Sequence, residues 1–386
     1  MGKRLHVIDA LRGFAIISIM LLHNIEHFDM YYTAENIPEW MVPIDQVIWH
    51  ILFFMFSGKS FAIFALLFGL TFYIQFENQR IKGNDFRLRF AWRMLLLLLF
   101  GVINSAFFQG DILTIYAVVG LFMIPLANLK NSVLLVIASL LLLQPLQLIQ
   151  IYHAIQHPNI ILPNPTSWTY FGNMGTYIQS DSLLDTLYGN LTNGRKAVLL
   201  WNYENGRYFQ ILALFILGYI LGRKKLFEWN ETTKKFWRKT AFASLVLYVL
   251  FYVLNTNLET LTSSKAISAT VLVITSSFMN LSFMLLLVAG FILLFYTSWA
   301  HKALQAIAPV GKMSLSNYVF QSIVGSVIYY GFGIGLYKYT GATYSFIIGL
   351  LLAAIFIVLC TWWNKYHKHG PLEGIWHKLT WIKFKS

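Results

Sequence analysis

Cysteine is almost missing from this chain: Cys360 is the only one in 386 residues, which excludes any disulfide within the chain. Charged residues are also scarce, because Asp, Glu, Lys and Arg together make up 12% of the sequence. An ordinary soluble domain carries about 25%. Acidic residues number 16 against 29 basic ones, a formal net charge of +13. So few charges cannot cover the surface of a water-soluble fold.

Several signatures of soluble enzymes are also missing. The sequence has no glycine-rich phosphate loop, no zinc-ligand spacing, no internal repeat and no low-complexity tract. We therefore expect no metal and a single domain over residues 1–386. Nucleic acid is not an expected partner, because Lys and Arg lie between apolar runs and not on one face. The first apolar run holds Asp9 and Arg12 and no small-residue cleavage site follows it, which indicates a retained helix and not a signal peptide.

Apolar residues dominate what is present. They make up 57% of the chain, the mean hydropathy is +0.60, and apolar runs near the length of a membrane span recur throughout. We predict an all-α polytopic membrane bundle of about ten transmembrane helices. The predicted spans are 8–29, 53–77, 93–109, 112–128, 131–152, 208–223, 240–256, 266–297, 314–336 and 343–362. Segment 44–56 is interfacial or re-entrant on this prediction, and 266–297 is tilted, kinked or divided.

The distribution of basic residues predicts that both termini are cytoplasmic, since cytoplasmic loops are enriched in Lys and Arg. With ten spans, most basic residues of the connecting segments lie on the side of the N-terminus. They are Lys3, Arg4, Arg80, Lys82, Arg87, Arg89, Arg93, Arg223, Lys224, Lys225, Lys234, Lys235, Arg238, Lys239, Lys365, Lys368, Lys378, Lys383 and Lys385. On the opposite side lie Arg195, Lys196, Arg207, Lys265 and Lys338. An odd number of spans would break this asymmetry.

Two segments lie outside the predicted spans. The long connection at about 153–207 faces outward on this topology and is rich in aromatic residues, among them Trp168, Phe171 and Trp201. These rings suit contact with a sugar or a lipid headgroup, and an interfacial aromatic belt explains them equally well. The tail at about 364–386 mixes Trp with Lys, which predicts an amphipathic anchor on the inner leaflet.

The first predicted helix carries an unusual polar stripe. Asp9, Arg12, His23, Glu26 and His27 fall within an arc of about 100° at the helical repeat, and Arg12 lies about 16 Å along the axis from His23. Ionisable groups within a span are costly and mark functional sites. Arg12 could hold a phosphate of cytoplasmic acyl-CoA, and His23 could be the base for an acceptor from outside. Alternatively, Asp9 and Arg12 form a structural ion pair, and both histidines bond carbonyl groups in the bundle.

Other polar residues have two interpretations each. Lys59 is an anion ligand or an anchor at the outer interface, and Lys312 is a ligand for a CoA phosphate or a cytoplasmic topology signal. Asp111 is an orienting group or the N-cap of the span at 112–128. Asn317 and Gln321 lie four residues apart on one helix face, where hydrogen bonding between helices or contact with a substrate accounts for them.

Six ordered blocks stand out along the chain: "IDALRGFAIISIMLLHNI", "GKSFAIFALLFG", "GDILTIYAVVGL", "RYFQILALFILGYILGR", "VGKMSLSNYVFQS" and "GPLEGIWHKLT". In this order they resemble the YeiB family of bacterial inner-membrane proteins, whose function is largely unassigned. They extend over residues 8–381, nearly the whole chain. The resemblance implies a multi-pass protein of the bacterial plasma membrane.

The first block further resembles the wider group of transmembrane acyltransferases, which includes heparan-alpha-glucosaminide N-acetyltransferase and bacterial enzymes that O-acylate surface polysaccharides. Arg12, Gly13 and His23 match the Arg-Gly and histidine of the polysaccharide enzymes. The residues that resemble the N-acetyltransferase branch are Asp9, Arg12, Gly13 and Asn24. This resemblance implies that Asn24 lies near the active centre.

Two positions depart from the YeiB pattern. Asn104 stands where such chains often have His, and Gly374 stands where they often have Trp. If the position of Asn104 carries the chemistry of the family, the activity of this chain is altered or lost.

These inferences lead to a membrane acyltransferase hypothesis. An acyl group, with acetyl the first candidate, would pass from cytoplasmic acyl-CoA to an extracytoplasmic glycan, lipid or small amine. His23 would be the base or acyl carrier, Asn24 and Asp111 orienting groups, and Arg12 with Lys59 or Lys312 the ligands of CoA. The expected partners are the lipid bilayer, acyl-CoA and the acceptor, and a homodimer is an open alternative. A transporter or flippase that uses the same polar stripe, or a non-catalytic membrane subunit, is the competing hypothesis.

Overall fold

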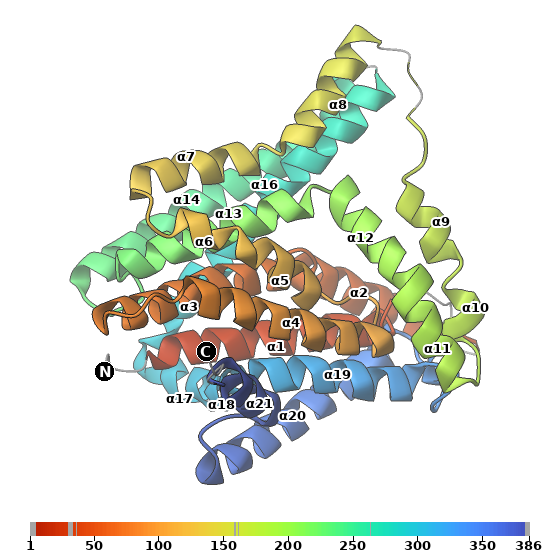
Figure 1. Cartoon of the computed structure of the whole chain (residues 1–386). Helices are drawn as coiled ribbons and strands as arrows, with labels where there is room; N and C mark the ends of the chain where they lie inside the picture. Colours follow the sequence, from red (N-terminus) through yellow and green to blue (C-terminus); the bar gives the residue numbers. More distant parts are fainter. Residues whose placement is uncertain are drawn as a thin grey trace.

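The computed structural model describes residues 5–29, 34–35, 37–157, 160, 162–262 and 264–382. Within these ranges every regular element is a helix and no strand occurs, as the sequence predicts (Figure 1). A helix makes its backbone hydrogen bonds within one segment and needs no partner strand. It is therefore stable in the lipid interior, where no water is present to bond the backbone. The predictions for Lys3, Arg4, Lys383 and Lys385, and for the end of the tail, lie outside the described residues.

Six segments of the described chain are long and apolar enough to cross a membrane. They are His6–Ile25 (α1), Glu39–Ile81 (η1, Glu39–Met41; α2, Val42–Phe56; α3, Ser60–Ile81), Arg87–Phe107 (α4), Glu231–Thr256 (α14), Lys265–Phe295 (α16) and Ala342–Tyr366 (α20). A seventh follows if α7 (Asn131–Leu142) and α8 (Pro145–Gln156), which meet at 46°, form one bent span. The chain is therefore a helical membrane protein.

Three predicted spans correspond to shorter helices. These are α5 (Leu113–Leu121), α13 (Arg207–Arg223) and α19 (Ser314–Tyr329), with 9, 17 and 16 residues. At 1.5 Å per residue, none of them covers about 30 Å of hydrocarbon alone. Length and composition thus support six or seven spans, and a total of about ten stays a prediction.

Two segments that the sequence left open are now defined. Segment 44–56 lies in helix α2, which a break at Gly58 (φ 75°) separates from α3. Segment 266–297 lies almost wholly in one continuous helix, α16, of 31 residues, which packs along α14. A helix of that length exceeds the thickness of the hydrocarbon core by a wide margin, so α16 crosses it at a tilt or extends beyond it.

Helix α1 lies at the centre of the bundle. It contacts α3, α16, α18 (Ala308–Lys312), α19 and α20, and Figure 1 shows α3 on one side of it and α18, α19 and α20 on the other. Most of its residues are buried, whereas α14 buries only 6% of its apolar window. The polar groups of α1 therefore face protein, and the apolar surface of α14 suits lipid.

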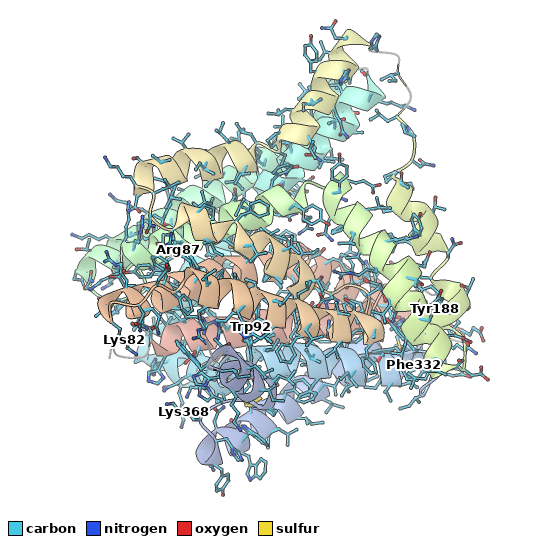
Figure 2. The ribbon with its side chains drawn as sticks, viewed as in Figure 1. Lys82, Arg87, Trp92, Tyr188, Phe332 and Lys368 are labelled. Atoms are coloured by element: carbon cyan, nitrogen blue, oxygen red, sulfur yellow. The ribbon has the colours of Figure 1, made fainter. Side chains whose placement is uncertain are left out.

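The predicted long loop at 153–207 is a helical cap at one end of the bundle and not an irregular segment (Figure 1). It contains the end of α8, then α9 (Thr166–Gly172), α10 (Gly175–Ile178), α11 (Leu183–Gly189), a π-helical turn η2 (Asn190–Gly194) and α12 (Arg195–Glu204). Figure 2 shows Tyr188 and Phe332 at this end and Lys82 and Lys368 toward the other. The remaining elements are α6 (Met123–Leu126), α15 (Leu258–Leu261), α17 (Ser298–Ala306), η3 (Leu336–Lys338) and α21 (Pro371–Thr380).

Helix α21 forms most of the described part of the predicted amphipathic tail, and it docks on the bundle. Trp92 Nε1 in α4 donates to the carbonyl oxygen of Leu379 at 3.0 Å, and Trp376 Nε1 donates to that of Arg93 at 3.2 Å. The Arg93 guanidinium also lies 4.1 Å from the centroid of the Trp376 ring. These contacts fix α21 across the start of α4.

A pair of glycines brings α1 and α18 into backbone contact. A Cβ atom on Gly13 would lie 2.2 Å from the carbonyl oxygen of Ile307, and one on Gly311 would lie 1.8 Å from that of Asp9. Only glycine permits this approach. Arg12 and Lys312, the neighbours of these glycines in the sequence, line one cavity.

Gly311→Ala is expected to lower the melting temperature of the detergent-solubilised protein, because α1 and α18 must separate. Overpacking of this kind typically costs about 1–3 kcal/mol. Gly290→Ala in α16 is the matched control, since a Cβ atom there meets nothing within 4 Å. Equal melting temperatures for both variants would contradict the close crossing.

Candidate functional site

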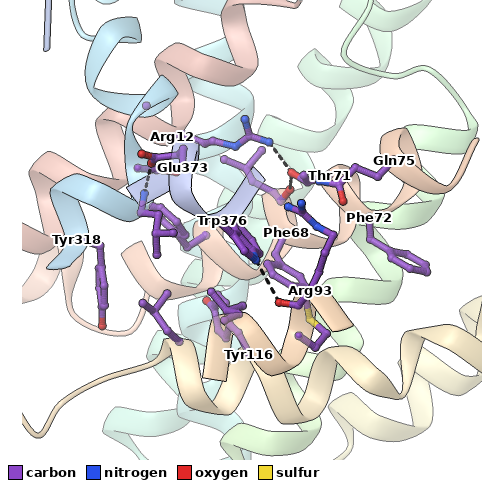
Figure 3. Close-up of a pocket in the computed structure, with 18 of the residues that line it drawn as sticks. Arg12, Phe68, Thr71, Phe72, Gln75, Arg93, Tyr116, Tyr318, Glu373 and Trp376 are labelled. Atoms are coloured by element: carbon purple, nitrogen blue, oxygen red, sulfur yellow. Dashed lines mark hydrogen bonds between the residues drawn. The ribbon is translucent and has the colours of Figure 1, made fainter. Parts of the chain in front are cut away.

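Two cavities lie along α1 at opposite ends of its polar stripe. The inner cavity, about 210 Å³, is surrounded by α1, α3, α4, α5, α18, α19 and α21, and Figure 3 shows its lining. Its polar wall is formed by Arg12, Thr71, Arg93, Lys312, Tyr318 and Glu373. Three cations against one carboxylate make this cavity suited to an anion.

The outer cavity, about 440 Å³, lies toward the helical cap. Its polar wall is formed by His23, Glu26, Asp29, Asp111, Arg207 and Tyr318. Aromatic rings from the cap, Trp168 and Trp201, complete it. Three carboxyl groups against one arginine make this cavity more acidic than the inner one.

The inner cavity holds Arg12 in a network of contacts. Its guanidinium lies 3.5 Å from the carboxylate of Asp9 and donates a hydrogen bond to the hydroxyl of Thr71 in α3. The structural ion pair that the sequence left open therefore exists, and Arg12 faces the cavity as well (Figure 3). A guanidinium that is already oriented in this way loses little side-chain entropy when it binds a phosphate.

The start of α19 is not a vacant anion site. The Glu373 carboxylate of α21 accepts hydrogen bonds from the backbone N–H of Leu315 at 2.7 Å and of Ser316 at 3.2 Å, and from the Ser316 hydroxyl at 2.5 Å. Burial raises the pKa of Glu373, and these hydrogen bonds act in the opposite direction. Lys312 does line the inner cavity, but the helix N-terminus beside it is filled by Glu373.

His23 lies in the wall of the outer cavity. Its Nδ1 atom lies 3.3 Å from Oε2 of Glu26, and its ring lies 4.7 Å from the Phe108 ring and 5.6 Å from the Phe28 ring, between centroids. Glu26 thus orients one nitrogen of the imidazole. A carboxylate on one nitrogen fixes the tautomer and leaves the other nitrogen for a substrate.

A left-handed turn follows α1, which ends at Ile25 and not at residue 29 as predicted. His27, Phe28 and Asp29 have φ values of 47°, 56° and 66°. Each costs about 1–2 kcal/mol for a residue with a side chain. Tertiary contacts hold the turn: Tyr330 donates to the carbonyl oxygen of Phe28 at 2.9 Å, and Gln109 donates to Asp29 at 3.2 Å. Strained backbone of this kind clusters at functional sites.

Two further candidates, His27 of the polar stripe and Asn24, point away from the outer cavity. His27 Nε2 lies 2.9 Å from the hydroxyl oxygen of Ser345 and 3.2 Å from that of Thr340. Asn24 donates to the carbonyl oxygen of Met20 at 2.8 Å and accepts from the Tyr329 hydroxyl at 3.0 Å. Neither His27 nor Asn24 lines the outer or the inner cavity. Both connect α1 to the helices beside it.

Asp111 lies one residue before Ile112, the N-cap of α5, and bonds the first turn of that helix, and it also lines the outer cavity. Its carboxylate accepts from the backbone N–H of Thr114 at 2.8 Å and from the amide of Asn104 at 3.1 Å. Arg195 of α12 lies 3.9 Å away, an ion pair that the sequence gave no means to find. Asn104 is fully buried and acts on the cavity only through Asp111.

Three further candidates lie outside both cavities. Lys59 is buried, with Nζ 5.9 Å and 5.7 Å from the ring centroids of Phe54 and Phe283. Asn317 donates to the carbonyl oxygen of Val310 at 2.9 Å, which ties α19 to α18. The amide of Gln321 is buried and has no hydrogen-bond partner within the described chain. None of the three is positioned to hold CoA in the inner cavity.

The two cavities meet at one side chain. Tyr318 of α19 is the only described residue in the walls of both, and its hydroxyl oxygen accepts the backbone N–H of Ile112 at 3.1 Å. Figure 3 shows Tyr318 at one side of the inner cavity. Arg12 and His23 are therefore in separate voids that share a single wall. Sequence reasoning missed Tyr318, and it assigned Arg93, Glu373 and Trp376 to a loop and a tail.

Comparison with known proteins gives the family. Residues 221–383 match the family model "Protein of unknown function (DUF418)". The chain is 27% identical to the uncharacterized protein YxaH of Bacillus subtilis (strain 168), over 100% of this chain and 96% of YxaH. It is 25% identical to the uncharacterized protein YeiB of Escherichia coli (strain K12), over 97% of this chain and 95% of YeiB. Over nearly its full length the chain is similar to YeiB.

The predicted resemblance to the YeiB family is thereby confirmed over nearly the full length of the chain. Matching relatives carry no assigned activity in their names, and no solved structure matches. The function of this YeiB-like protein has to be inferred from its cavities.

Asp29→Asn is expected to change how stability depends on pH. Burial and repulsion from Glu26 raise the pKa of Asp29 from 3.8 to about 7, so the native state holds the proton more tightly than the unfolded chain. Stability contributed by this group is present at low pH and is lost as pH rises toward 7. Melting temperatures from pH 5 to 8 should therefore favour the variant increasingly as pH rises.

Asp181→Asn, at an exposed position in the cap, is the control and should show no such trend. A constant difference between Asp29→Asn and the unmodified protein across this pH range would mean that Asp29 is ionised throughout.

Proposed function

We propose that this YeiB-like protein is a membrane acyltransferase. It moves an acyl group, with acetyl the first to test, from cytoplasmic acyl-CoA to an extracytoplasmic glycan, lipid or small amine. The observation that carries the proposal is the pair of differently charged cavities, one holding Arg12 and the other His23, that share the wall at Tyr318. Transfer across a bilayer needs the donor and the acceptor to approach one point from opposite sides.

The inner cavity suits the donor. CoA is a polyanion on a slender pantetheine arm, and Arg12, Arg93 and Lys312 supply cations from three different elements. Apolar side chains of α3 and α4, such as Phe68 and Leu97, line the rest and suit the arm. Lys59 is not included, because it lies against Phe54 and Phe283 away from this cavity.

The outer cavity suits an acceptor with a hydroxyl or amino group. Glu26, Asp29 and Asp111 can accept hydrogen bonds from such groups, and the rings of Trp168 and Trp201 can pack on a sugar face or an alkyl chain. His23, oriented by Glu26, is the general base that removes the acceptor proton. The same residues serve a transient His23 acyl intermediate.

The topology proposed for this function has about ten spans, with both termini in the cytoplasm of a bacterial plasma membrane. Lys82, Arg87 and Lys368 lie toward the end of the bundle opposite the helical cap (Figure 2), which is the asymmetry that cytoplasmic loops require. The inner cavity then opens on the side that contains acyl-CoA.

A transporter or flippase is the second candidate. Two cavities divided by a single side chain also describe a closed transport path. If α7 and α8 form one span, their bend makes it a broken helix of the kind found in transporters. The two functions differ in their need for CoA. Proton flux driven by a substrate in proteoliposomes without CoA would support transport.

His23→Ala and Arg12→Ala are expected to separate catalysis from donor binding. Inverted membrane vesicles that contain the full chain receive [14C]acetyl-CoA on the cytoplasmic face, and label fixed in the lumen is counted. His23→Ala should reduce the rate about 100-fold or more, through loss of the base. Arg12→Ala should weaken CoA binding about tenfold or more, through loss of a charged hydrogen bond.

CoA binding is measured by the rise in melting temperature that CoA produces. His50→Ala and Arg238→Ala, at exposed positions of α2 and α14, are the matched controls and should keep full activity. Unchanged transfer by both His23→Ala and Arg12→Ala would remove the proposed mechanism.

A further inference from the structure

Tyr318 occupies the position where a donor and an acceptor would have to meet. It lies in the second turn of α19, is 4% exposed, and is the only described residue that lines both cavities. Arg12 and Lys312 lie on the inner side of this residue, and His23 and Asp111 lie on the outer side. A group that passes from one cavity to the other at their shared wall contacts Tyr318.

The hydroxyl of Tyr318 can donate a hydrogen bond to a ligand. Within the described residues its one hydrogen bond is as an acceptor, from the backbone N–H of Ile112 at 3.1 Å. This contact fixes the phenolic oxygen and leaves its O–H as a donor for a ligand. An accepted hydrogen bond also strengthens the one that the same hydroxyl donates.

Tyr116 shows that this arrangement is particular to Tyr318. Tyr116 also lines the inner cavity, but its hydroxyl donates to the carbonyl oxygen of Phe61 at 2.7 Å. Its proton is therefore already used within the bundle. Among the two tyrosines of the inner cavity, only Tyr318 can donate to a ligand without breaking a contact to the protein.

The loop that holds Tyr318 in place is itself well fixed. Ile112 follows Asp111, whose carboxylate is bonded to Thr114 and Asn104. The hydrogen bond from Ile112 thus connects the phenol to a short, buried segment between α4 and α5. A donor held in this way needs no rearrangement when charge develops beside it, which is the condition for an oxyanion-stabilising group.

We propose that Tyr318 is a catalytic residue whose hydroxyl donates a hydrogen bond to the carbonyl oxygen of the acyl thioester at the junction of the cavities. This inference rests on the proposed acyltransferase function. The acceptor oxygen or nitrogen forms a bond to the carbonyl carbon while His23 takes the acceptor proton, and the carbonyl oxygen becomes an oxyanion that faces Tyr318. Collapse of this intermediate restores the carbonyl group and breaks the C–S bond, and the CoA thiolate leaves to the inner side.

One proton is released on the outer side of the membrane, and one is taken up on the cytoplasmic side. His23 passes the proton it has taken to the outer cavity, through Glu26 and the neighbouring Asp29. The thiolate of CoA takes a proton from cytoplasmic water, since a thiol with a pKa near 8.5 is mostly protonated at neutral pH. Tyr318 keeps its own proton throughout, because it stabilises charge without transferring a proton.

Tyr318→Phe tests this role, with Tyr219→Phe as its matched control. Both variants remove one hydroxyl from a buried tyrosine, but Tyr219 in α13 donates to the carbonyl oxygen of Ala127 at 2.7 Å, away from both cavities. The rate of [14C]acetyl transfer in inverted vesicles is measured at saturating acetyl-CoA, together with the melting temperature of the purified protein with and without CoA.

The expected result is a fall of about 100- to 1,000-fold in the rate for Tyr318→Phe, the effect of losing one oxyanion donor. The rise in melting temperature with CoA should be unchanged, because CoA without an acyl group has no thioester carbonyl for Tyr318 to bond. Tyr219→Phe should keep the rate.

Three outcomes overturn the role of Tyr318. A rate for Tyr318→Phe that stays near that of the unmodified protein removes the catalytic role alone. Loss of the CoA-induced shift in Tyr318→Phe assigns the residue to ground-state binding instead. An unmodified protein with neither acetyl transfer nor a CoA-induced shift overturns the acyltransferase function and this role with it.

Discussion

Backbone contact between α1 and α18 determines where the charges of this protein can act. Gly13 and Gly311 let the two helices approach until a Cβ atom at either position would meet a carbonyl oxygen. Arg12 and Lys312 are the neighbours of these glycines, so the crossing itself places two cations in the inner cavity. The Arg-Gly pair of the first helix therefore has a combined role. Gly13 permits the close approach of the two helices, and Arg12 lies beside this contact in the wall of the inner cavity.

At the other end of α1 a second constraint acts. Three consecutive residues with positive φ stop the helix and return the chain, so that Asp29 lines the outer cavity beside His23 and Glu26 while His27 turns toward α20. Such a turn is unfavourable alone, and its partners Tyr330 and Gln109 come from distant parts of the chain. The acidic cluster near His23 thus depends on the packing of α19 and of the loop after α4 as much as on α1.

The difference between the ends of α1 explains what could be predicted from the sequence. Helical periodicity correctly placed Arg12 and His23 in a polar line, because both lie within one regular helix whose geometry is local. The same periodicity wrongly extended that helix to residue 29, because no local signal announces a left-handed turn in the residues Glu26 to Asp29. Tyr318 could not be identified from the sequence for another reason. It is one of 21 tyrosines, and only its place in the walls of both cavities distinguishes it.

Glu373 shows a similar limit. In the sequence it belongs to a basic, aromatic tail that suits the membrane surface, yet in the structure it caps α19 more than fifty residues earlier in the chain. That contact places the Glu373 carboxylate in the wall of the inner cavity, beside the cations Arg12, Arg93 and Lys312. The difference in charged groups between the two cavities then has a functional consequence: the cations of the inner cavity favour an anionic donor, and the carboxyl groups of Glu26, Asp29 and Asp111 disfavour it in the outer cavity. Direction of transfer can thus be set by electrostatics alone, with no need for a large change in the positions of the helices.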